Sequence, residues 1–484
     1  MQTISILETG AIPDGKTLAT AAIQKAIARC AEAGGGRVVI PAGRFLTGMV
    51  RLRSNIELHL SRGSVLLASS DPDDSKPWTS LERSGDHWRQ AETSAWHLIL
   101  AEDCTDIALT GPGALDGQGH LHYPEIPHGE IGWPRSYHSD GRRPGALVQL
   151  TRCARVKICD VQLGNVANWT MHLYDCDHVR IRDLLILNPA EAPNADGIDL
   201  TGCHWVTISG CHIDTCDDAI CLKTMPHSRT CENVTVLNCV LRTSCAALKL
   251  GAGESFQDMR NVVFSSCTVS GSSRGIALYS LEGAVLENIS VDNIVCDTRA
   301  PLMFTRPIHV DVRKKSPSSR VGAVRNLRIS GMLAETNGRC LFTAADGGVI
   351  EDVVLDGLHL RYPVVDDPQP HAAHFGGGQF SAHSPWARQV RAALIFDGVD
   401  GLTLRNVQIR WPHPDETPAP GWQPGKKLAN GDDRIFHPED WKLDPETPFA
   451  ALALRETTVR LLEDGGLTGF QGGPLHADPA ETTG

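Results

Sequence analysis

The chain has 484 residues, a formal net charge of −12 at pH 7 and only 5% aromatic residues. Its length alone would allow about two or three domains, but short β-branched runs from about residue 38 to about residue 410, with no linker-like stretch between, favour one elongated repetitive domain. The low aromatic content predicts a core of Val, Ile, Leu and Ala. The acidic balance argues against a nucleic-acid partner, which needs a basic face to release phosphate counterions. It does not exclude an anionic ligand, because a local cationic pocket can form on an acidic protein.

The sequence predicts no membrane segment and no secretion signal. It has no run of 18 apolar residues, and residues 1–15 lack the basic and apolar regions of a signal peptide. We therefore expect a cytoplasmic protein, or a secreted or periplasmic one if the start of the chain is trimmed.

The first predicted element is a short amphipathic helix over residues 18–33. The stop signal Gly34-Gly35-Gly36 follows it. Its apolar face consists of Ala22, Ile23, Ala26, Ile27 and Cys30. A helix in this place would cover the open edge of the first strands and block aggregation through that edge.

A short motif, Cys-x-x-Val or a close variant, then recurs along the chain. Its copies end at Ile107, Val156, Val179, Val206, Val234 and Val262. The five valines follow one another at 23, 27, 28 and 28 residues, a period that predicts a β-solenoid. A leucine-rich repeat is the rival at this period, but its regular Leu spacing and helical pattern are missing. We predict an all-β fold, a right-handed single-stranded parallel β-helix with an N-terminal capping helix.

The repeat pattern divides the chain into three parts. Residues 1–37 are predicted to form the cap segment with its helix, and residues 38–361 the β-helix domain. Residues 362–484 are rich in Pro, Gly and His and are predicted to form an irregular extension whose further strands pack on the β-helix. A long insertion at residues 116–145 interrupts the coils.

Stacked coils place equal positions in columns, which gives most of the 15 cysteines a structural role. One column reads Cys104, Cys153, Cys176, Cys203, Cys231 and Met259, and another reads Cys211, Cys239 and Cys267. We predict buried, reduced thiols in a narrow core, with disulfides between neighbouring coils as the alternative. No Cys-x-x-Cys pair supports a zinc site. A corner column, predicted to be a hydrogen-bonded turn ladder, consists of Asn233, Asn261, Asn288 and Asn326.

The sharpest polar signal is a group of three aspartates. Asp196 lies in Asn194-Ala-Asp-Gly, and Asp217-Asp218 follow about one coil later. The apolar register aligns Ile198 with Ile220, Leu248 and Ile276, and Leu200 with Leu222, Leu250 and Leu278. Asp196 and Asp218 then share a column, with Asp217 beside them.

Three carboxylates this close repel one another, and hydrolysis of a glycosidic bond would use them. One protonated carboxyl donates to the leaving oxygen while the others activate water, and inverting enzymes keep acid and base roughly 6.5–9.5 Å apart so that water fits between them. A calcium site or plain solvated turn residues are the alternatives.

The chain resembles glycoside hydrolase family 28, the polygalacturonase-like, pectin-degrading β-helix enzymes, over roughly residues 8–360. The matching segments are Gly10-Ala-Ile-Pro-Asp14-Gly15, Gly35-Gly36-Arg-Val-Val-Ile-Pro41, Gly113-Ala-Leu-Asp116-Gly117, Trp169-Thr-Met-His172, Asn194-Ala-Asp196-Gly and Asp217-Asp218. The resemblance implies that Asp217 is the general acid, that Asp196 and Asp218 activate water, and that cleavage inverts the anomeric centre. It implies no cofactor and no catalytic metal.

The chain departs from the family at its substrate-binding motifs. The Gly-His-Gly motif falls at Cys245-Ala246-Ala247, and the Arg-Ile-Lys clamp falls at Ala277-Leu278-Tyr279. A displaced cationic grip is possible, because Lys249 occupies the Arg column one coil earlier and Lys223 the Lys column two coils earlier; surface strand residues are the alternative.

Further substrate-binding candidates surround these positions. Arg274 either clamps substrate or neutralises the aspartates, and Glu254 is a further candidate. His172, one coil before Asp199, either contacts sugar or packs a turn. Tyr279 is included because it stands at the clamp. Rings of the insertion either stack on sugars or pack within the loop; they are His120, Tyr123, Trp133, Tyr137 and His138.

The leading hypothesis is an inverting glycosidase that acts on pectin-type oligosaccharides of the plant cell wall. The insertion and the Trp-rich tail favour a pocket closed at one end, hence exo-action, and the lost clamp predicts poor activity on plain polygalacturonate. One rival is a polysaccharide lyase or epimerase of β-helix fold, and another is a non-catalytic carbohydrate-binding solenoid. The expected partner is an oligosaccharide; the sequence leaves the oligomeric state open.

Overall fold

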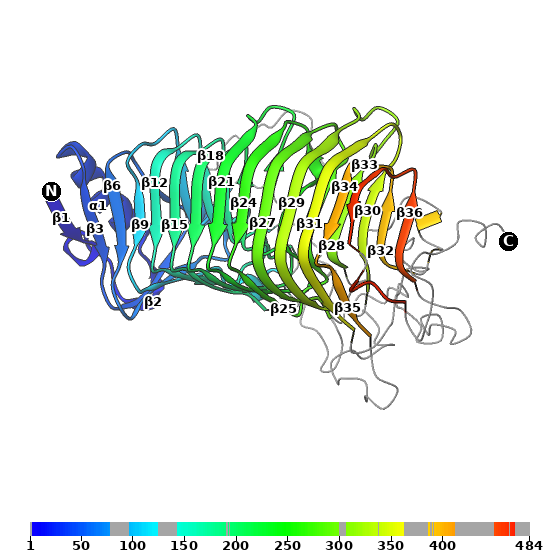
Figure 1. The fold of residues 1–484 in the computed structure, drawn as a ribbon. Helices are drawn as coiled ribbons and strands as arrows, with labels where there is room; N and C mark the ends of the chain where they lie inside the picture. The colour runs from blue at the N-terminus through cyan, green and yellow to red at the C-terminus, as the bar shows by residue number, and fades with distance from the viewer. Residues whose placement is uncertain are drawn as a thin grey trace. The chain divides into compact units, whose positions relative to one another are not determined.

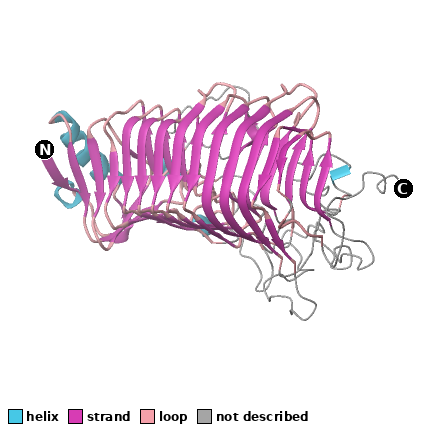
Figure 2. Cartoon of the chain, viewed as in Figure 1, coloured by secondary structure: helices cyan, strands magenta, loops and turns pink. Residues whose placement is uncertain are grey.

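The computed structural model describes residues 2–77, 96–123, 143–189, 192, 194–299, 306–336, 338–362, 386–387, 390, 392–411, 450–463 and 465–469. The chain forms two compact units, residues 1–219 and 220–484, called unit 1 and unit 2 and described separately. Both consist almost wholly of short strands that pair in parallel with the strands of the neighbouring coil (Figures 1 and 2). This is the predicted β-helix.

The N-terminal helix is confirmed. Helix α1 spans Thr20–Glu32, and it buries the five residues that the sequence pattern selected, Ala22, Ile23, Ala26, Ile27 and Cys30. It contacts β1 (Gln2–Ser5), β3 (Gly36–Ile40), β5 (Val50–Arg51) and β6 (Ile56–Leu60), at the N-terminal end of unit 1 in Figure 1. The helix therefore covers the first coils with its apolar face.

Unit 1 contains two sets of strands. The first set is a ladder in which β5, β8 (Ile99–Glu102), β11 (Val148–Thr151), β14 (Met171–Tyr174) and β17 (Ile198–Thr201) pair in that order. The remaining strands are β2 (Asp14–Leu18), β4 (Gly43–Thr47), β7 (Ser64–Ala68), β9 (Ala108–Thr110), β10 (Ala114–Asp116), β12 (Ala154–Cys159), β13 (Gln162–Gly164), β15 (Asp177–Arg182), β16 (Leu185–Leu187), β18 (His204–Ser209) and β19 (His212–Thr215). Short 3-10 turns lie at Ile6–Thr9, Pro72–Ser75 and Gly119–Leu121.

Unit 2 repeats this plan. Its first ladder consists of β20 (Ile220–Thr224), β23 (Ala246–Ser255), β26 (Arg274–Ser280), β28 (Arg306–Val312), β30 (Cys340–Ala344), β32 (Ala392–Asp397) and β36 (Ala450–Arg455). Its other strands are β21 (Cys231–Leu237), β22 (Val240–Thr243), β24 (Met259–Ser265), β25 (Thr268–Ser270), β27 (Val285–Asp297), β29 (Ala323–Glu335), β31 (Val349–Arg361), β33 (Val399–Asp400), β34 (Leu402–Arg405), β35 (Gln408–Arg410) and β37 (Val459–Leu462).

The first ladder of each unit differs from the other strands in burial. β15 and β18 alternate buried and exposed residues, as expected for a sheet with one solvated face. Every residue of β14, β17, β23 and β26 is buried. Polar side chains on these ladders therefore lie in a shielded environment, where charges interact more strongly than in water.

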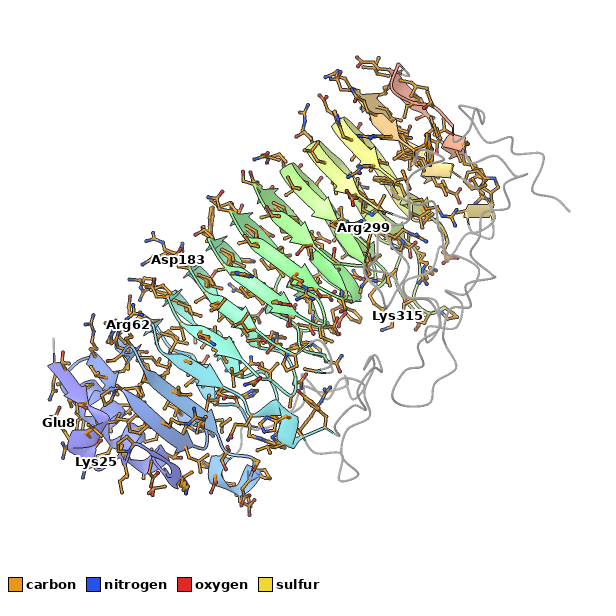
Figure 3. The ribbon with its side chains drawn as sticks, turned by 90° about the horizontal axis from the view of Figure 1, so that it is seen from below. Glu8, Lys25, Arg62, Asp183, Arg299 and Lys315 are labelled. Carbon is orange, nitrogen blue, oxygen red and sulfur yellow. The ribbon has the colours of Figure 1, made fainter. Side chains whose placement is uncertain are left out.

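Exposed charged side chains lie on the other faces. Figure 3 shows Glu8, Lys25 and Arg62 projecting from the outer surface of unit 1. Ion pairs link neighbouring coils there, such as Arg152 with Asp103 at 2.7 Å. Because both partners are exposed, each such pair contributes at most about 1 kcal/mol to stability.

The predicted columns are present. All 15 cysteines are buried and free, as predicted for reduced core thiols. In unit 2 the side-chain amides of the asparagine ladder donate from Asn261 to Asn233, from Asn288 to Asn261 and from Asn326 to Asn288 over 3.1, 3.1 and 2.8 Å. These four residues have φ between +50° and +58°, a left-handed turn conformation that Asn tolerates better than most residues.

The described strands after residue 361 continue the coils of unit 2. β34 and β35 pair with β31, and β36 pairs with β32. Trp422 and Trp441 of the predicted extension lie outside the described residues, and the division into three domains stays a prediction. No helix within the described ranges is both long and apolar enough to cross a membrane.

Candidate active site

The backbone brings Asp196 and Asp218 to the same position on consecutive coils of unit 1. The N–H of Gly197 donates to the carbonyl of Asp218 over 2.9 Å, and the N–H of Ile198 donates to the carbonyl of Ala219 over 3.0 Å. In a parallel ladder these two bonds set Asp196 beside Asp218. The predicted column is confirmed.

The close packing of the coils at Asp196 depends on two local features. Gly197 allows the coils to come close, because a Cβ at this position would lie 2.4 Å from the carbonyl oxygen of Ala219. Asn194 adopts φ +52°, and the hydroxyl of Thr215 donates to the carbonyl of Ala195. Thr215 also accepts a bond from the amide of Asn188 at 3.0 Å. The turn before β17 is therefore held on both sides.

The three carboxylates are buried and close together. Asp196, Asp217 and Asp218 are 3%, 8% and 2% exposed, and carboxylate oxygens of Asp217 and Asp218 lie within 4.8 Å of each other. Oδ1 of Asp217 accepts the backbone N–H of Asp218 at 2.9 Å, and its Oδ2 accepts the amide of Asn194 over 3.5 Å. Both oxygens of Asp217 are thus oriented by the protein.

A buried arginine that the sequence interpretation missed joins this cluster. Arg143 is 6% exposed; it donates to the carbonyl of Ala167 at 3.3 Å and to Oδ1 of Asn194 at 3.1 Å. Burial lowers the pKa of its guanidinium to about 9, against the opposing charges of Asp196 and Asp217, so Arg143 is a cation at neutral pH. The signal in the sequence is the basic pair before Pro144-Gly145, at the end of the insertion.

His172 packs inside the ladder. It is 1% exposed and pairs with Asp199 in the register of β14 and β17, as predicted. Its ring nitrogens lie 2.9 Å from Oε1 of Gln149 and 2.9 Å from Oγ1 of Thr201. Since both nitrogens have protein partners, the geometry favours the packing alternative over sugar contact.

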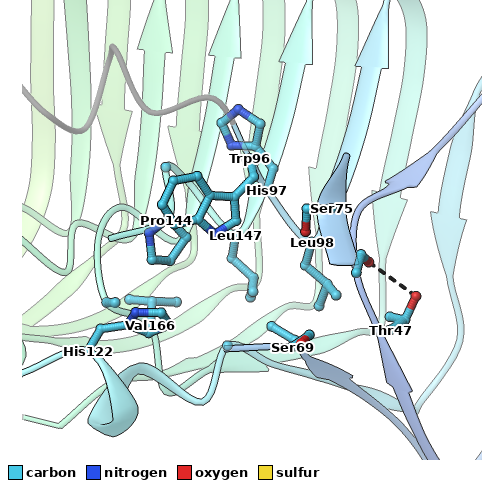
Figure 4. Close-up of a pocket in the computed structure, with 15 residues that line it drawn as sticks. Thr47, Ser69, Ser75, Trp96, His97, Leu98, His122, Pro144, Leu147 and Val166 are labelled. Atoms are coloured by element: carbon cyan, nitrogen blue, oxygen red, sulfur yellow. Dashed lines mark hydrogen bonds between the residues drawn. The ribbon is translucent and has the colours of Figure 1, made fainter. Parts of the chain in front are cut away.

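A small cavity lies N-terminal to the aspartates in unit 1. Trp96, His97, His122 and Pro144 are among its lining residues (Figure 4), and His97 is fixed by the carbonyl of Ala146 at 2.8 Å. Its volume of about 20 Å³ holds one or two water molecules and is too small for a sugar ring. Of the rings predicted beside the cleft, Tyr123 is buried and His120 exposed; Trp133, Tyr137 and His138 lie outside the described residues.

Unit 2 holds the other predicted binding residues, and all of them are buried. Lys223, Lys249, Glu254, Arg274 and Tyr279 are between 0% and 4% exposed, so the exposed-residue alternative for the two lysines is wrong for this structure. Lys249 pairs with Ala277, which confirms its column. The register shifts between Leu222 and Thr224, so Lys223 lies at an irregularity and not in a regular column with Tyr279.

Tyr279 has a partner that the sequence interpretation also missed. Its hydroxyl lies 2.9 Å from Nδ1 of His309, which is on the next coil. Burial raises the pKa of Tyr279. Burial, with the charges of Arg306, Arg274 and Arg313, lowers the pKa of His309 well below its usual value. His309 is therefore neutral. Extending the apolar register from Ile276 to Ile308 would have located it.

Two of the aspartates are also candidates to bind a divalent cation. Asp217 and Asp218 supply oxygens close enough to share one ion. Calcium takes about six to eight oxygen ligands, and the carboxylates of two residues supply only part of such a shell. The calcium alternative thus rests on ligands beyond this pair.

Comparison with known proteins identifies the family. A model of the glycosyl hydrolases family 28 matches residues 30–313, more than half of the chain. The chain belongs to glycosyl hydrolase family 28. Its fold is accordingly the predicted right-handed parallel β-helix.

Named relatives agree with this assignment. The chain is similar to a probable polygalacturonase from Vitis vinifera, with 33% identity over 45% of this chain and 44% of that protein. It is similar to an endo-polygalacturonase from Pectobacterium carotovorum subsp. carotovorum, with 24% identity over 72% of this chain and 82% of that protein. The match thus spans less than half the length of the Vitis relative.

A solved structure shows the same fold. The hyperthermoactive exopolygalacturonase from Thermotoga maritima superposes with a TM-score of 0.65 and 20% identity, over 84% of this chain and 92% of that one. At this identity the likeness supports the architecture alone.

Proposed function

We propose that this family 28 protein hydrolyses O-glycosidic bonds in pectin-type oligosaccharides with inversion of the anomeric centre. The observation that carries the proposal is the backbone register that sets Asp196 beside Asp218, with Asp217 adjoining and buried with them. Family membership supports the same reaction class. The partner is an oligosaccharide, and no cofactor is invoked.

The roles follow from proton transfer. Asp217, as a protonated acid, gives its proton to the glycosidic oxygen as the bond to the anomeric carbon breaks. Asp196 and Asp218 remain ionised, hold a water on the opposite face of the sugar and accept its proton. Two neighbouring negative charges favour the protonated form of the third carboxyl, which suits the acid.

The finer substrate preference is part of the proposal. The family's histidine and cationic clamp are replaced by Ala246, Ala277 and Tyr279, which supports poor activity on plain polygalacturonate. The buried Lys249 and Arg274 supply positive charge on nearby coils of unit 2, which supports a sugar acid bound in another pose. We also propose exo-action and a cytoplasmic location. The similar proteins include both an endo-polygalacturonase and an exopolygalacturonase.

Two alternatives remain defined by their chemistry. A lyase or epimerase would abstract a proton from C5 of a sugar acid, commonly with calcium, and the carboxylates of Asp217 and Asp218 could contribute to that ion site. A carbohydrate-binding solenoid would retain the cluster without turnover.

The test is a panel of pectic and neutral oligosaccharides incubated with the purified protein, with and without a chelator. The proposal predicts new reducing ends without ultraviolet-absorbing unsaturated products, at a rate that the chelator leaves unchanged. Unsaturated products, or dependence on calcium, would establish the lyase. Tight binding with no turnover of any substrate would establish the binding solenoid. Brisk turnover of plain polygalacturonate would overturn the substrate preference alone.

A further inference from the structure

Arg143 bridges two coils of unit 1. It lies just before the coil of β11, and its Nη1 bonds the carbonyl of Ala167, on the coil of β14. Its Nη2 reaches Oδ1 of Asn194, ahead of β17. The planar guanidinium thereby makes two directed contacts, which the point charge of a lysine cannot reproduce.

The second contact decides the orientation of Asn194. A side-chain amide can rotate by a half turn, which exchanges its oxygen and nitrogen. Because the guanidinium of Arg143 has only donors, it can bond Asn194 only when the amide oxygen of Asn194 faces it. The nitrogen of Asn194 then faces Oδ2 of Asp217 at 3.5 Å.

We infer that Arg143 is a positioning residue for the proposed hydrolysis: through Asn194 it fixes the carboxyl of Asp217, and its charge balances the aspartates. This inference rests on the proposed function and names a residue that the family motifs quoted above do not include. Since Asn194 occupies Oδ2 and the N–H of Asp218 occupies Oδ1, rotation of the Asp217 carboxyl is restricted on both sides.

The charge of Arg143 acts on Asp196 and Asp217 together. The charges of both carboxylates raise the pKa of Arg143, and Asp218 follows Asp217 in the same turn. A cation near a carboxylate lowers its pKa by about 1–3 units when the two lie within hydrogen-bonding distance or slightly beyond. Removal of the charge should therefore move both limbs of a bell-shaped pH profile to higher pH.

The experiment compares wild type with Arg143→Met, Arg143→Lys and Arg155→Met. Arg143→Met should lower kcat about 10- to 100-fold, part of the contribution of a positioned acid, leave KM within about threefold, and shift both limbs upward by about one pH unit. Arg143→Lys keeps the charge and should lower kcat without moving the limbs. Arg155→Met removes an exposed cation paired with Asp106 and should change neither.

Three outcomes would overturn the inference. An unshifted profile in Arg143→Met, with kcat reduced only in proportion to the folded fraction by circular dichroism, would mean a structural role. A rise in KM at constant kcat would mean substrate contact. An additive effect with Asn194→Ala would mean that the two residues act independently.

The inference also has a readout that does not depend on turnover. If the wild type cleaves no substrate, the proposed function fails, and the carboxyl carbons of Asp196 and Asp217 are titrated by NMR in both proteins. Arg143→Met should raise their pKa by about one unit. Unchanged titration would overturn the role of Arg143 by itself.

Discussion

The two units differ in the buried charged residues that they contain. In unit 1, Asp196, Asp217 and Asp218 are buried, and so is Arg143, whose pKa the charges of Asp196 and Asp217 raise. In unit 2, the ladder strands bury the cations Lys249, Arg274 and Arg306, the acids Glu254 and Asp311, and the hydrogen-bonded pair Tyr279–His309. Burying like charges together is unfavourable unless a ligand or a reaction uses them. Under the proposed function, the aspartates of unit 1 carry the acid–base chemistry, and the cations of unit 2 are candidates for binding an anionic group.

The largest expected effect belongs to the acidic side of the comparison. Asp217→Asn removes the transferable proton at nearly constant volume, so kcat should fall at least about 100-fold. The measurement is steady-state release of reducing sugar on the best substrate. Asp183→Asn, at an exposed turn with φ +55° that Asn tolerates, is the matched control and should retain full activity. Equal losses of kcat in Asp217→Asn and Asp183→Asn would contradict a specific role of Asp217 as the acid.

Removal of a buried cation from unit 2 should raise KM and leave kcat unchanged. Lys249→Met removes a buried charge that we assign to a substrate carboxylate, so KM for acidic oligosaccharides should rise about 10- to 100-fold, the value of a charge-assisted hydrogen bond. Neutral oligosaccharides should show no such rise. If kcat fell instead and KM stayed constant for both substrate classes, Lys249 would belong with the chemistry.

A smaller effect is expected in stability. Tyr279→Phe removes the hydroxyl beside Nδ1 of His309 and leaves a buried polar atom without that partner, which should lower the free energy of unfolding by about 1–3 kcal/mol. Urea unfolding followed by circular dichroism measures it. A variant as stable as wild type would show that His309 finds another partner.

The smallest effect is a dependence on pH. The folded pKa of His309 lies well below its value in the unfolded chain, near 6.5. Below that pH the unfolded state binds a proton that the folded state does not. The contribution of His309 to the free energy of unfolding is therefore full above pH 6.5, and it is lost at up to about 1.4 kcal/mol per pH unit as the pH falls. Below pH 6.5 the free energy of unfolding should therefore fall more steeply with falling pH in wild type than in His309→Gln. Equal slopes would contradict a neutral buried imidazole.

The sequence predicted the features that repeat from coil to coil and missed those that arise in segments without a repeat. The Cys and Asn columns and the place of Asp196 beside Asp218 follow from a period in the twenties, because one register sets every equivalent position. The apolar face of α1 follows from the helical spacing of its residues. Arg143 comes from an insertion with no period, and its reach to Asn194 depends on side-chain length and packing. The register shifts at Lys223 because β23 has more residues than β20 between the pairs Leu222–Leu250 and Thr224–Ser255, an irregularity that the repeat does not predict.

The account depends on the acidic cluster performing a single displacement by water. Proton NMR of the first product, recorded before mutarotation on the best substrate of the panel, tests this directly. We predict an anomeric configuration opposite to that of the bond cleaved. A product that retains the configuration would contradict the roles assigned to Asp196, Asp217 and Asp218.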